Sequence, residues 1–138
     1  MEMQIEYRQG ESAFGPEEFV GLAQRVWPRD YDLNQAAEAV HKTINVGAWA
    51  GTRLVGTVRI LTDGYFFSTV PEVMVDPDYR RRGIGRELMH RALALAPGGR
   101  LFFGAQSGNE PFFEASGFVR GPVGFVGRRP HIGSRAAV

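Results

Sequence analysis

A short apolar strand, an arginine-rich turn and an amphipathic helix follow one another in the middle of the chain, and this unit constrains the fold most. Residues 70–75 read VPEVMV, and the strand predicted there leaves the sheet at Asp76-Pro77. Pro71 removes a ladder donor, which indicates a strand entrance or a bulge. The helix begins near Ile84 and stops at Pro97-Gly98-Gly99. Its buried stripe is Ile84, Leu88, Ala92 and Leu95.

The flanking segments predict further helices and strands on both sides of this unit. A first strand over residues 4–7 precedes a helix after Pro16, with the stripe Phe19, Leu22, Ala23, Val26 and Trp27. A second helix starts at Asp32, which can cap it while Gln35 reaches back, and Leu33, Ala36, Ala37 and Val40 form its stripe. The remaining elements are a hairpin of residues 45–50 and 53–61, a buried strand over 100–104, a helix over 110–116 and a strand over 118–126. The chain is therefore expected to be an α/β protein with a mixed (α+β) sheet.

Length and composition favour one domain. The chain has 138 residues, 43% of them hydrophobic, and neither a repeat nor a linker, so we expect a single domain over 1–138 with a frayed tail over 128–138. Lys and Arg number 16 against 15 Asp and Glu, and a net charge of +1 argues against nucleic-acid binding, which needs a basic excess. The absence of cysteine excludes disulfides, thiolate metal sites and a cysteine nucleophile.

Neither a membrane nor a metal is expected as a partner. The N-terminal residues MEMQIEYRQG lack a basic start followed by an apolar block, and no stretch reaches the roughly 18 apolar residues of a membrane span. A cytoplasmic location is the default expectation. The histidines stand at 41, 90 and 131, too far apart in sequence to indicate a metal cluster. The oligomeric state is open, and a homodimer is compatible with the sequence.

The turn before the central helix has the composition of an anion site. Gly83 and Gly85 let a ligand approach the free amides of the helix start, where the helix dipole adds positive charge. Arg80, Arg81 and Arg82 add full charges, so a pyrophosphate would fit. The alternative is a tight turn beside a solvated run of arginines. A dinucleotide fingerprint would need glycine where Leu88 stands, and no P-loop motif occurs.

Residues 75–85, VDPDYRRRGIG, resemble the pyrophosphate-binding signature of the GNAT superfamily of N-acetyltransferases. The resemblance implies that amides from Arg81 to Arg86 bind the pyrophosphate of acetyl-CoA and that the backbone of Val73, Met74 and Val75 pairs with the pantetheine arm. The implied coenzyme residues in this region are Val73, Met74, Val75, Arg80, Arg81, Arg82, Gly83, Ile84, Gly85 and Arg86.

Residues 109–118, NEPFFEASGF, resemble the family's later motif, in which an Asn precedes a short helix that ends in Gly-Phe. Asn109, Phe112 and Phe113 are accordingly implied to contact the coenzyme. The resemblance also implies a GNAT-like central sheet that is splayed between its fourth and fifth strands and flanked by about four helices. The coenzyme would enter that opening, between residues 73–75 and 101–104.

The chemistry needs a neutral amine, and an amine that titrates near about 10.4 is rarely neutral at pH 7. By resemblance, Glu72 is the candidate general base, because family members often place a carboxylate on this strand; a polar residue on the open face of the sheet is the alternative. The family's usual general acid, a tyrosine four residues before Gly-Phe, is replaced by Phe113. Since a thiol titrates near about 8.5, it can leave as thiolate.

Aromatic residues occur where the family lines its acceptor cleft, and the implied substrate-binding residues are Trp27, Tyr31, Tyr65 and Phe67. They could equally fill the core or a packed loop. With Glu72 and Asp30 as negative contacts, they favour a small-molecule or amino-acid amine as acceptor. The expected reaction is transfer of acetyl from acetyl-CoA by direct attack in a ternary complex. A protein or peptide N-acetyltransferase and a non-catalytic acyl-CoA-binding or regulatory module remain alternatives.

Overall fold

The computed structural model describes residues 4–130, which form two compact units, one ending at Phe103 and one beginning at Gly104. The first unit contains β1 Ile5–Gln9, η1 Gly10–Ser12, α1 Pro16–Val26, α2 Leu33–His41, β2 Ile44–Ala50, β3 Arg53–Thr62, β4 Ser68–Thr69, β5 Val73–Val75, η2 Pro77–Tyr79, α3 Ile84–Leu95 and η3 Pro97–Gly99. The second contains α4 Glu110–Ala115. The predicted α/β class is confirmed. The single domain stays a prediction, and most of the predicted tail, from residue 131 on, lies outside the described residues.

The sheet has five strands in the first unit. Its path runs β1, β2, β3, β4, and β5 also pairs with β3; all four strand pairs are antiparallel. β2 and β3 form the predicted hairpin, in which Gly51 has a φ of 62°. That value suits glycine, because a side chain is disfavoured at positive φ. The longest strand, β3, therefore lies at the centre, paired with β2 on one side and with β4 and β5 on the other.

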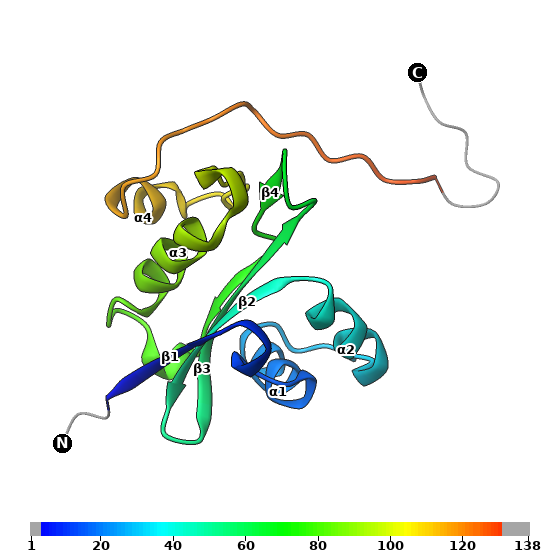
Figure 1. The fold of residues 1–138 in the computed structure, drawn as a ribbon, viewed down its shortest axis with the longest axis vertical. Helices are drawn as coiled ribbons and strands as arrows, with labels where there is room; N and C mark the ends of the chain where they lie inside the picture. The colour runs from blue at the N-terminus through cyan, green and yellow to red at the C-terminus, as the bar shows by residue number, and fades with distance from the viewer. Residues whose placement is uncertain (1–3, 131–138) are drawn as a thin grey trace. The chain divides into compact units, whose positions relative to one another are not determined.

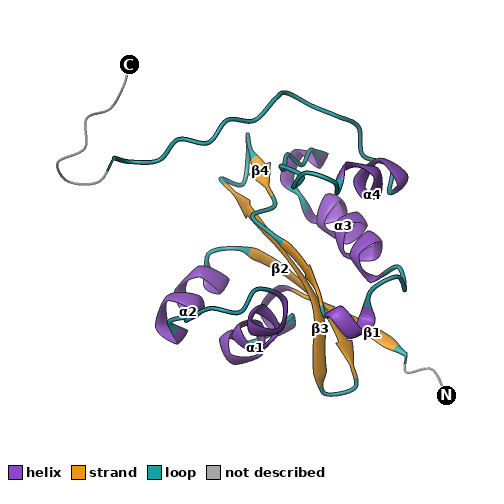
Figure 2. Ribbon diagram, turned by 180° about the vertical axis from the view of Figure 1, so that it is seen from behind, coloured by secondary structure: helices purple, strands orange, loops and turns teal. Residues whose placement is uncertain are grey.

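Helices pack on both faces of the sheet (Figures 1 and 2): α3 on one face, α1 and α2 on the other. α3 lies close to β3, because a Cβ added to Gly56 would be 2.9 Å from Cγ2 of Ile84 and 3.0 Å from Cδ1 of Leu88. The opposite face packs a separate apolar cluster, which includes Phe14, Phe19, Leu22, Trp49, Leu54 and Met74. Apolar burial of this kind supplies most of the stabilisation of a small domain.

The first two helices begin as predicted, but their stripes are less buried than predicted. Asp32 caps α2 by accepting a hydrogen bond from the amide of Gln35. Trp27 is 42% exposed and Leu33 44% exposed. Trp27 falls after the last residue of α1, with a φ of −134° and a ψ of 84°, so it leaves the helical stripe. Leu33 is the first residue of α2, beyond the part of the helix that contacts the core.

Two predicted strands are absent from the described residues. Of residues 100–104, only Phe102 pairs, in a single parallel bridge to Thr69, and residues 101–103 are half-buried rather than buried. The pairing is short because β4 itself has only two residues. Residues 118–130 contain no strand. Gly121, Pro122 and Gly124 interrupt this stretch, and both residue types weaken strands.

The aromatic run 65–67 lies in the turn between β3 and β4 and does not belong to the core. Tyr65 is 82% exposed, Phe66 93% and Phe67 53%. The carboxylate of Asp63 orders this turn, because it accepts hydrogen bonds from the amides of all three aromatic residues at 2.7–3.1 Å. These amides, with that of Tyr65 first, lower the pKa of Asp63. The interpretation of these aromatics as core residues is therefore wrong.

Candidate functional site

A bulge separates β4 from β5 and shapes the sheet where Glu72 lies. β3 pairs with β5 at Val58 opposite Val73 and with β4 at Leu61 opposite Thr69, so residues 70–72 face only residues 59 and 60. The extra residue falls next to Pro71, which lacks an amide hydrogen and tolerates such a break. The predicted interruption at Pro71 is confirmed. Among the described residues, β5 pairs with β3 alone, and the single bridge of Thr69 to Phe102 lies on the other side of the bulge, as in a sheet splayed at this point.

Glu72 forms a close ion pair with Arg59 of β3. The guanidinium donates from Nε to one carboxylate oxygen and from a terminal nitrogen to the other, each at 2.6 Å. The side chains are only 13% and 17% exposed. The Arg59 guanidinium also lies 5.4 Å from the centre of the Phe19 ring of α1. Glu72 is thus neither on an open face nor unpaired; a two-point contact fixes its orientation.

The backbone of β5 offers hydrogen-bonding groups on its outer edge. The amide of Asp76 donates to the carbonyl of Val55 at 2.8 Å, which puts Asp76 and, two residues earlier, Met74 among the residues bonded to β3. Because bonded positions alternate along an antiparallel strand, the amides and carbonyls of Val73 and Val75 point away from β3. An extended amide-containing ligand could pair with them.

The turn into α3 leaves the helix start open. Gly83 is the residue before the helix, with a φ of 80°, and it provides no side chain to cap it. A Cβ added to Gly83 would meet nothing within 4 Å, so the space above it is free in this unit. The first intrahelical bond runs from the amide of Glu87 to the carbonyl of Gly83, which leaves the amides of Ile84, Gly85 and Arg86 without a helical acceptor.

The arginines around this helix start are exposed, and two of them contact neighbouring groups. Arg81 has a φ of 64°, an uncommon value for a residue with a side chain. Arg82 lies 4.9 Å from the centre of the Tyr79 ring, and Nε of Arg80 is 3.4 Å from the carbonyl oxygen of Val75. Together with the helix dipole, three arginines and Arg86 make this end of α3 strongly positive.

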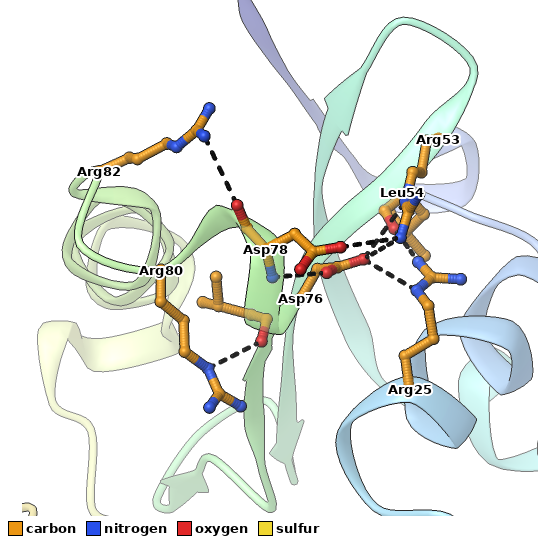
Figure 3. Close-up of polar contacts among 8 residues, drawn as sticks. Arg25, Arg53, Leu54, Asp76, Asp78, Arg80 and Arg82 are labelled. Atoms are coloured by element: carbon orange, nitrogen blue, oxygen red, sulfur yellow. Dashed lines mark hydrogen bonds and ion pairs between the residues drawn. The ribbon is translucent and has the colours of Figure 1, made fainter.

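A buried carboxylate fixes the turn that precedes this loop (Figure 3). Asp76 is 1% exposed and accepts hydrogen bonds from Arg25 of α1 at 2.8 Å, from Arg53 of β3 at 2.9 Å and from the amide of Asp78 at 2.9 Å. Burial acts to raise the pKa of Asp76, but the amide of Asp78 and the two guanidinium groups outweigh it, and the pKa is lowered. Arg25 also donates to the carbonyl of Leu54 at 2.6 Å, so the network connects α1, β3 and η2.

The second unit carries the remaining predicted coenzyme residues. Asn109 immediately precedes α4, and its side chain makes no capping hydrogen bond. Phe112 is 42% exposed and packs edge to face against Phe113 at a centroid distance of 5.0 Å. Phe113 is half-buried and has no hydroxyl to serve as an acid. The predicted short helix is confirmed as α4, Glu110–Ala115.

The four predicted acceptor residues lie in two turns of the first unit, one between α1 and α2 and one between β3 and β4 (Figure 1). In the turn between α1 and α2, the Tyr31 hydroxyl donates to the carbonyl of Trp27 at 2.8 Å, and Tyr31 packs partly against the core. In the turn between β3 and β4, Phe67 stacks on Phe102 at 5.5 Å, while Tyr65 is mostly exposed. Tyr65 thus has the largest exposed fraction of the four side chains.

Residues 4–130 contain no group of three or more histidine, aspartate and glutamate side chains that could hold a metal ion. Over the same residues, the helices are too short or too polar for a bilayer crossing.

Sequence reasoning missed Arg59 and the roles of Asp76, Arg25 and Arg53. Arg59 stands in an otherwise apolar stretch of β3, and a charge in such a stretch needs a partner. Pairing the hairpin with the strand after it would have placed Glu72 beside Arg59. The sequence indicates only a strand exit at Asp76, because a carboxylate followed by proline usually marks a turn.

Comparison with known proteins adds a family match. The family model for the acetyltransferase (GNAT) domain matches residues 12–126. GCN5-related N-acetyltransferase 2, chloroplastic, from Arabidopsis thaliana is 33% identical over 78 residues, which are 54% of this chain and 30% of that relative. An uncharacterized N-acetyltransferase from Porphyra purpurea is matched over 47% of its length, so this chain spans less than half of these relatives.

Two solved structures share the fold. The GNAT family acetyltransferase SP0256 from Streptococcus pneumoniae has a TM-score of 0.74 and 23% identity, over 91% of this chain and 100% of that one. The aminoglycoside N-acetyltransferase AAC(6')-Iy, in complex with CoA, has a TM-score of 0.72 and 17% identity, over 94% of this chain and 97% of that one. At these identities, both show the fold alone.

Proposed function

Because the GNAT domain model matches residues 12–126, this chain belongs to the GNAT acetyltransferase family, and we propose that it transfers the acetyl group of acetyl-CoA to a primary amine. The proposed acceptor is a small molecule or a free amino acid, which attacks the thioester directly in a ternary complex. The observation that carries the proposal is the open, positively charged start of α3, which follows β5 with its outward backbone groups.

The coenzyme is proposed to bind along these two elements. The amides of Ile84, Gly85 and Arg86 would bind the pyrophosphate, assisted by the exposed side chains of residues 80–82. The outward groups of Val73 and Val75 would pair with the two amides of the pantetheine arm. Asn109, Phe112 and Phe113 remain proposed contacts from the second unit. The CoA in the related aminoglycoside enzyme supports this type of cosubstrate.

In the proposed reaction, the amine nitrogen bonds to the thioester carbon, the carbon–sulfur bond breaks, and CoA leaves as thiolate. Glu72 is the proposed base that takes the proton of the ammonium, directly or through one water. Its position at the bulge, just before the strand proposed to bind pantetheine, supports a role near the thioester end of the arm. After the attack, the nitrogen would lose its second proton to solvent. Since Phe113 has no acidic proton, the leaving thiolate would take its proton from solvent.

The acceptor is proposed to contact exposed aromatic surface. The Asp63 carboxylate holds the backbone amides of Tyr65 and Phe67, which orders this turn before a ligand arrives. A turn whose backbone is already ordered loses less conformational entropy on binding. Trp27 and Tyr31 are proposed as contacts from the turn between α1 and α2. A location in the cytoplasm and a homodimer stay predictions.

One observation favours a second candidate, a non-catalytic module that binds acyl-CoA. The family's usual acid position holds Phe113. A protein that binds the coenzyme for regulation would not need that hydroxyl. Coenzyme binding without turnover distinguishes this candidate from an enzyme.

The coenzyme site is tested by calorimetry with acetyl-CoA on Gly83→Val. The new side chain would occupy the free space above the helix start and strain a φ of 80°, so binding should be lost. Gly10→Val is the matched control, because Gly10 has a φ of 74° and equally open surroundings outside the proposed site. If Gly83→Val bound acetyl-CoA with an affinity within about threefold of the wild type, the loss of binding free energy would be under about 0.7 kcal/mol. That result would refute the assignment.

The reaction is tested by thiol release from acetyl-CoA with a panel of small amines, amino acids and peptides. Small amines should give the highest kcat/KM. If a peptide is acetylated with a kcat/KM well above that of every small amine, the acceptor is a protein and not a small molecule. Tight CoA binding without turnover for any amine would favour the non-catalytic module.

A further inference from the structure

The ion pair between Arg59 and Glu72 has features of a built arrangement rather than a chance surface contact. Both carboxylate oxygens are engaged at 2.6 Å, and both side chains are largely buried. The Phe19 ring supports the guanidinium, at 5.4 Å from its centre. Surface ion pairs usually lack such two-point geometry and burial.

The location of the pair matters as much as its geometry. Glu72 belongs to the bulge, where residues 70–72 face two residues of β3. A bulged segment has fewer ladder hydrogen bonds to hold it, so its side chains are less well fixed by the sheet. Arg59 lies on β3, which is also paired with β2 at this point, with Asn45 opposite Arg59. The rigid strand thus holds the irregular one through this side-chain contact.

Arg59 can act on a basic Glu72 by fixing the orientation of its carboxylate. The fork holds the carboxylate in one orientation and leaves the other lone pair of each oxygen for a ligand. Misplacement of a catalytic group by about 1 Å can cost about a hundredfold in rate. Without Arg59, the carboxylate would be half-buried and unpaired, a costly state that favours reorientation.

We propose that Arg59 is a positioning residue for the transfer reaction, which acts by holding Glu72 at the bulge. The proposal rests on the proposed function, with Glu72 as base. Removal of Arg59 therefore slows the reaction and leaves coenzyme binding intact.

The test is steady-state kinetics of thiol release with acetyl-CoA and the best amine of the panel. Arg59→Met should lower kcat by about 10- to 100-fold and leave the KM for acetyl-CoA within about threefold. Arg59→Lys keeps the charge and one contact, so its log kcat should exceed that of Arg59→Met by at least about a third of the gap between Arg59→Met and the wild type. Arg8→Met is the matched control, because Arg8 also pairs with a glutamate through Nε and lies 4.6 Å from the Trp49 ring centre, on the edge strand β1. Its kcat should stay within about twofold of the wild type.

A double variant separates positioning from an independent role. In the Glu72→Gln background, Arg59→Met should lower kcat by less than about threefold, because its target is already gone. This comparison also decides the matter if Arg59→Met alone fails to fold, since the double variant leaves no unpaired charge. A further loss of tenfold or more in the double variant would overturn the inference. So would an unchanged or raised kcat of Arg59→Met while the wild type turns over. A wild type that binds acetyl-CoA but acetylates no amine refutes the proposed function, and the inference with it.

Discussion

Replacement of Asp76 by asparagine should destabilise the first unit in a way that depends on pH. The amide has the same shape and its oxygen can still accept from the amide of Asp78, 2.9 Å away in the wild type. The NH₂ group, however, would face the donors of Arg25 and Arg53, which both contact one oxygen of Asp76. Removal of one partner of a fully buried ion pair costs about 3–5 kcal/mol. Because the arginine side chains are 35% and 46% exposed, water takes part of that cost, and we expect about 2 kcal/mol at pH 7.

The pH dependence follows from the lowered pKa of Asp76 in the folded chain. A carboxyl group with a lowered folded pKa stabilises the fold above its unfolded pKa of about 3.9, and this stabilisation is lost as the pH falls through the lower folded value. Asparagine does not titrate. The difference in unfolding free energy between wild type and Asp76→Asn should therefore be complete above about pH 5 and should shrink below about pH 4.

Urea unfolding at several pH values between 3 and 7 measures this difference. Asp78→Asn is the control, because Asp78 is 80% exposed and 4.0 Å from Arg53, and its loss should cost under about 0.5 kcal/mol. If Asp76→Asn costs no more than Asp78→Asn at pH 7, the network does not stabilise the fold. A cost that stays the same down to pH 3 would refute the role of the charge.

Two further predictions concern single side chains. Thr57 is fully buried, and its hydroxyl has no hydrogen-bond partner among the described residues. Thr57→Val should therefore raise the free energy of unfolding, measured by urea denaturation, by about 1 kcal/mol. A loss of stability would show that the hydroxyl has a hydrogen-bond partner. Glu72→Gln should lower kcat by about 10²- to 10⁴-fold and leave the affinity for acetyl-CoA unchanged by calorimetry, because the amide keeps the shape but cannot take a proton; an unchanged rate would remove Glu72 as the base.

Local chemistry explains which parts of the fold could be predicted. α3 has a regular apolar stripe and a Pro-Gly-Gly stop, and the hairpin has a glycine turn between two largely apolar strands, so the sequence predicts both within a few residues. The strands predicted at 100–104 and 118–126 are absent for a different reason. Strand formation depends on the partner available, and the first of these segments meets a two-residue β4, while glycines and Pro122 break the second.

In the candidate site too, features set by adjacent residues could be predicted, and features set by contacts between distant residues could not. The open helix start at Gly83 follows from residues adjacent in sequence, and its glycine and arginines could be recognised directly. The two ion-pair groups depend on contacts over longer separations, since Arg59 and Glu72 are 13 residues apart and Arg25 and Asp76 are 51 apart. Such pairs depend on strand register and helix packing, which spacing along the chain does not reveal.

The Arg59–Glu72 pair also changes the expectation about the acceptor. Glu72 was expected, with Asp30, to attract a protonated amine by its negative charge. Paired with Arg59 at 2.6 Å, it forms a neutral unit whose field falls off much faster than that of a single charge. Asp30 is exposed, where salt screens its charge within about 10 Å. Long-range attraction of a cation is therefore weak, and preference for an amine acceptor must come from contacts made at the site, with the aromatic turn at 65–67 as the candidate surface.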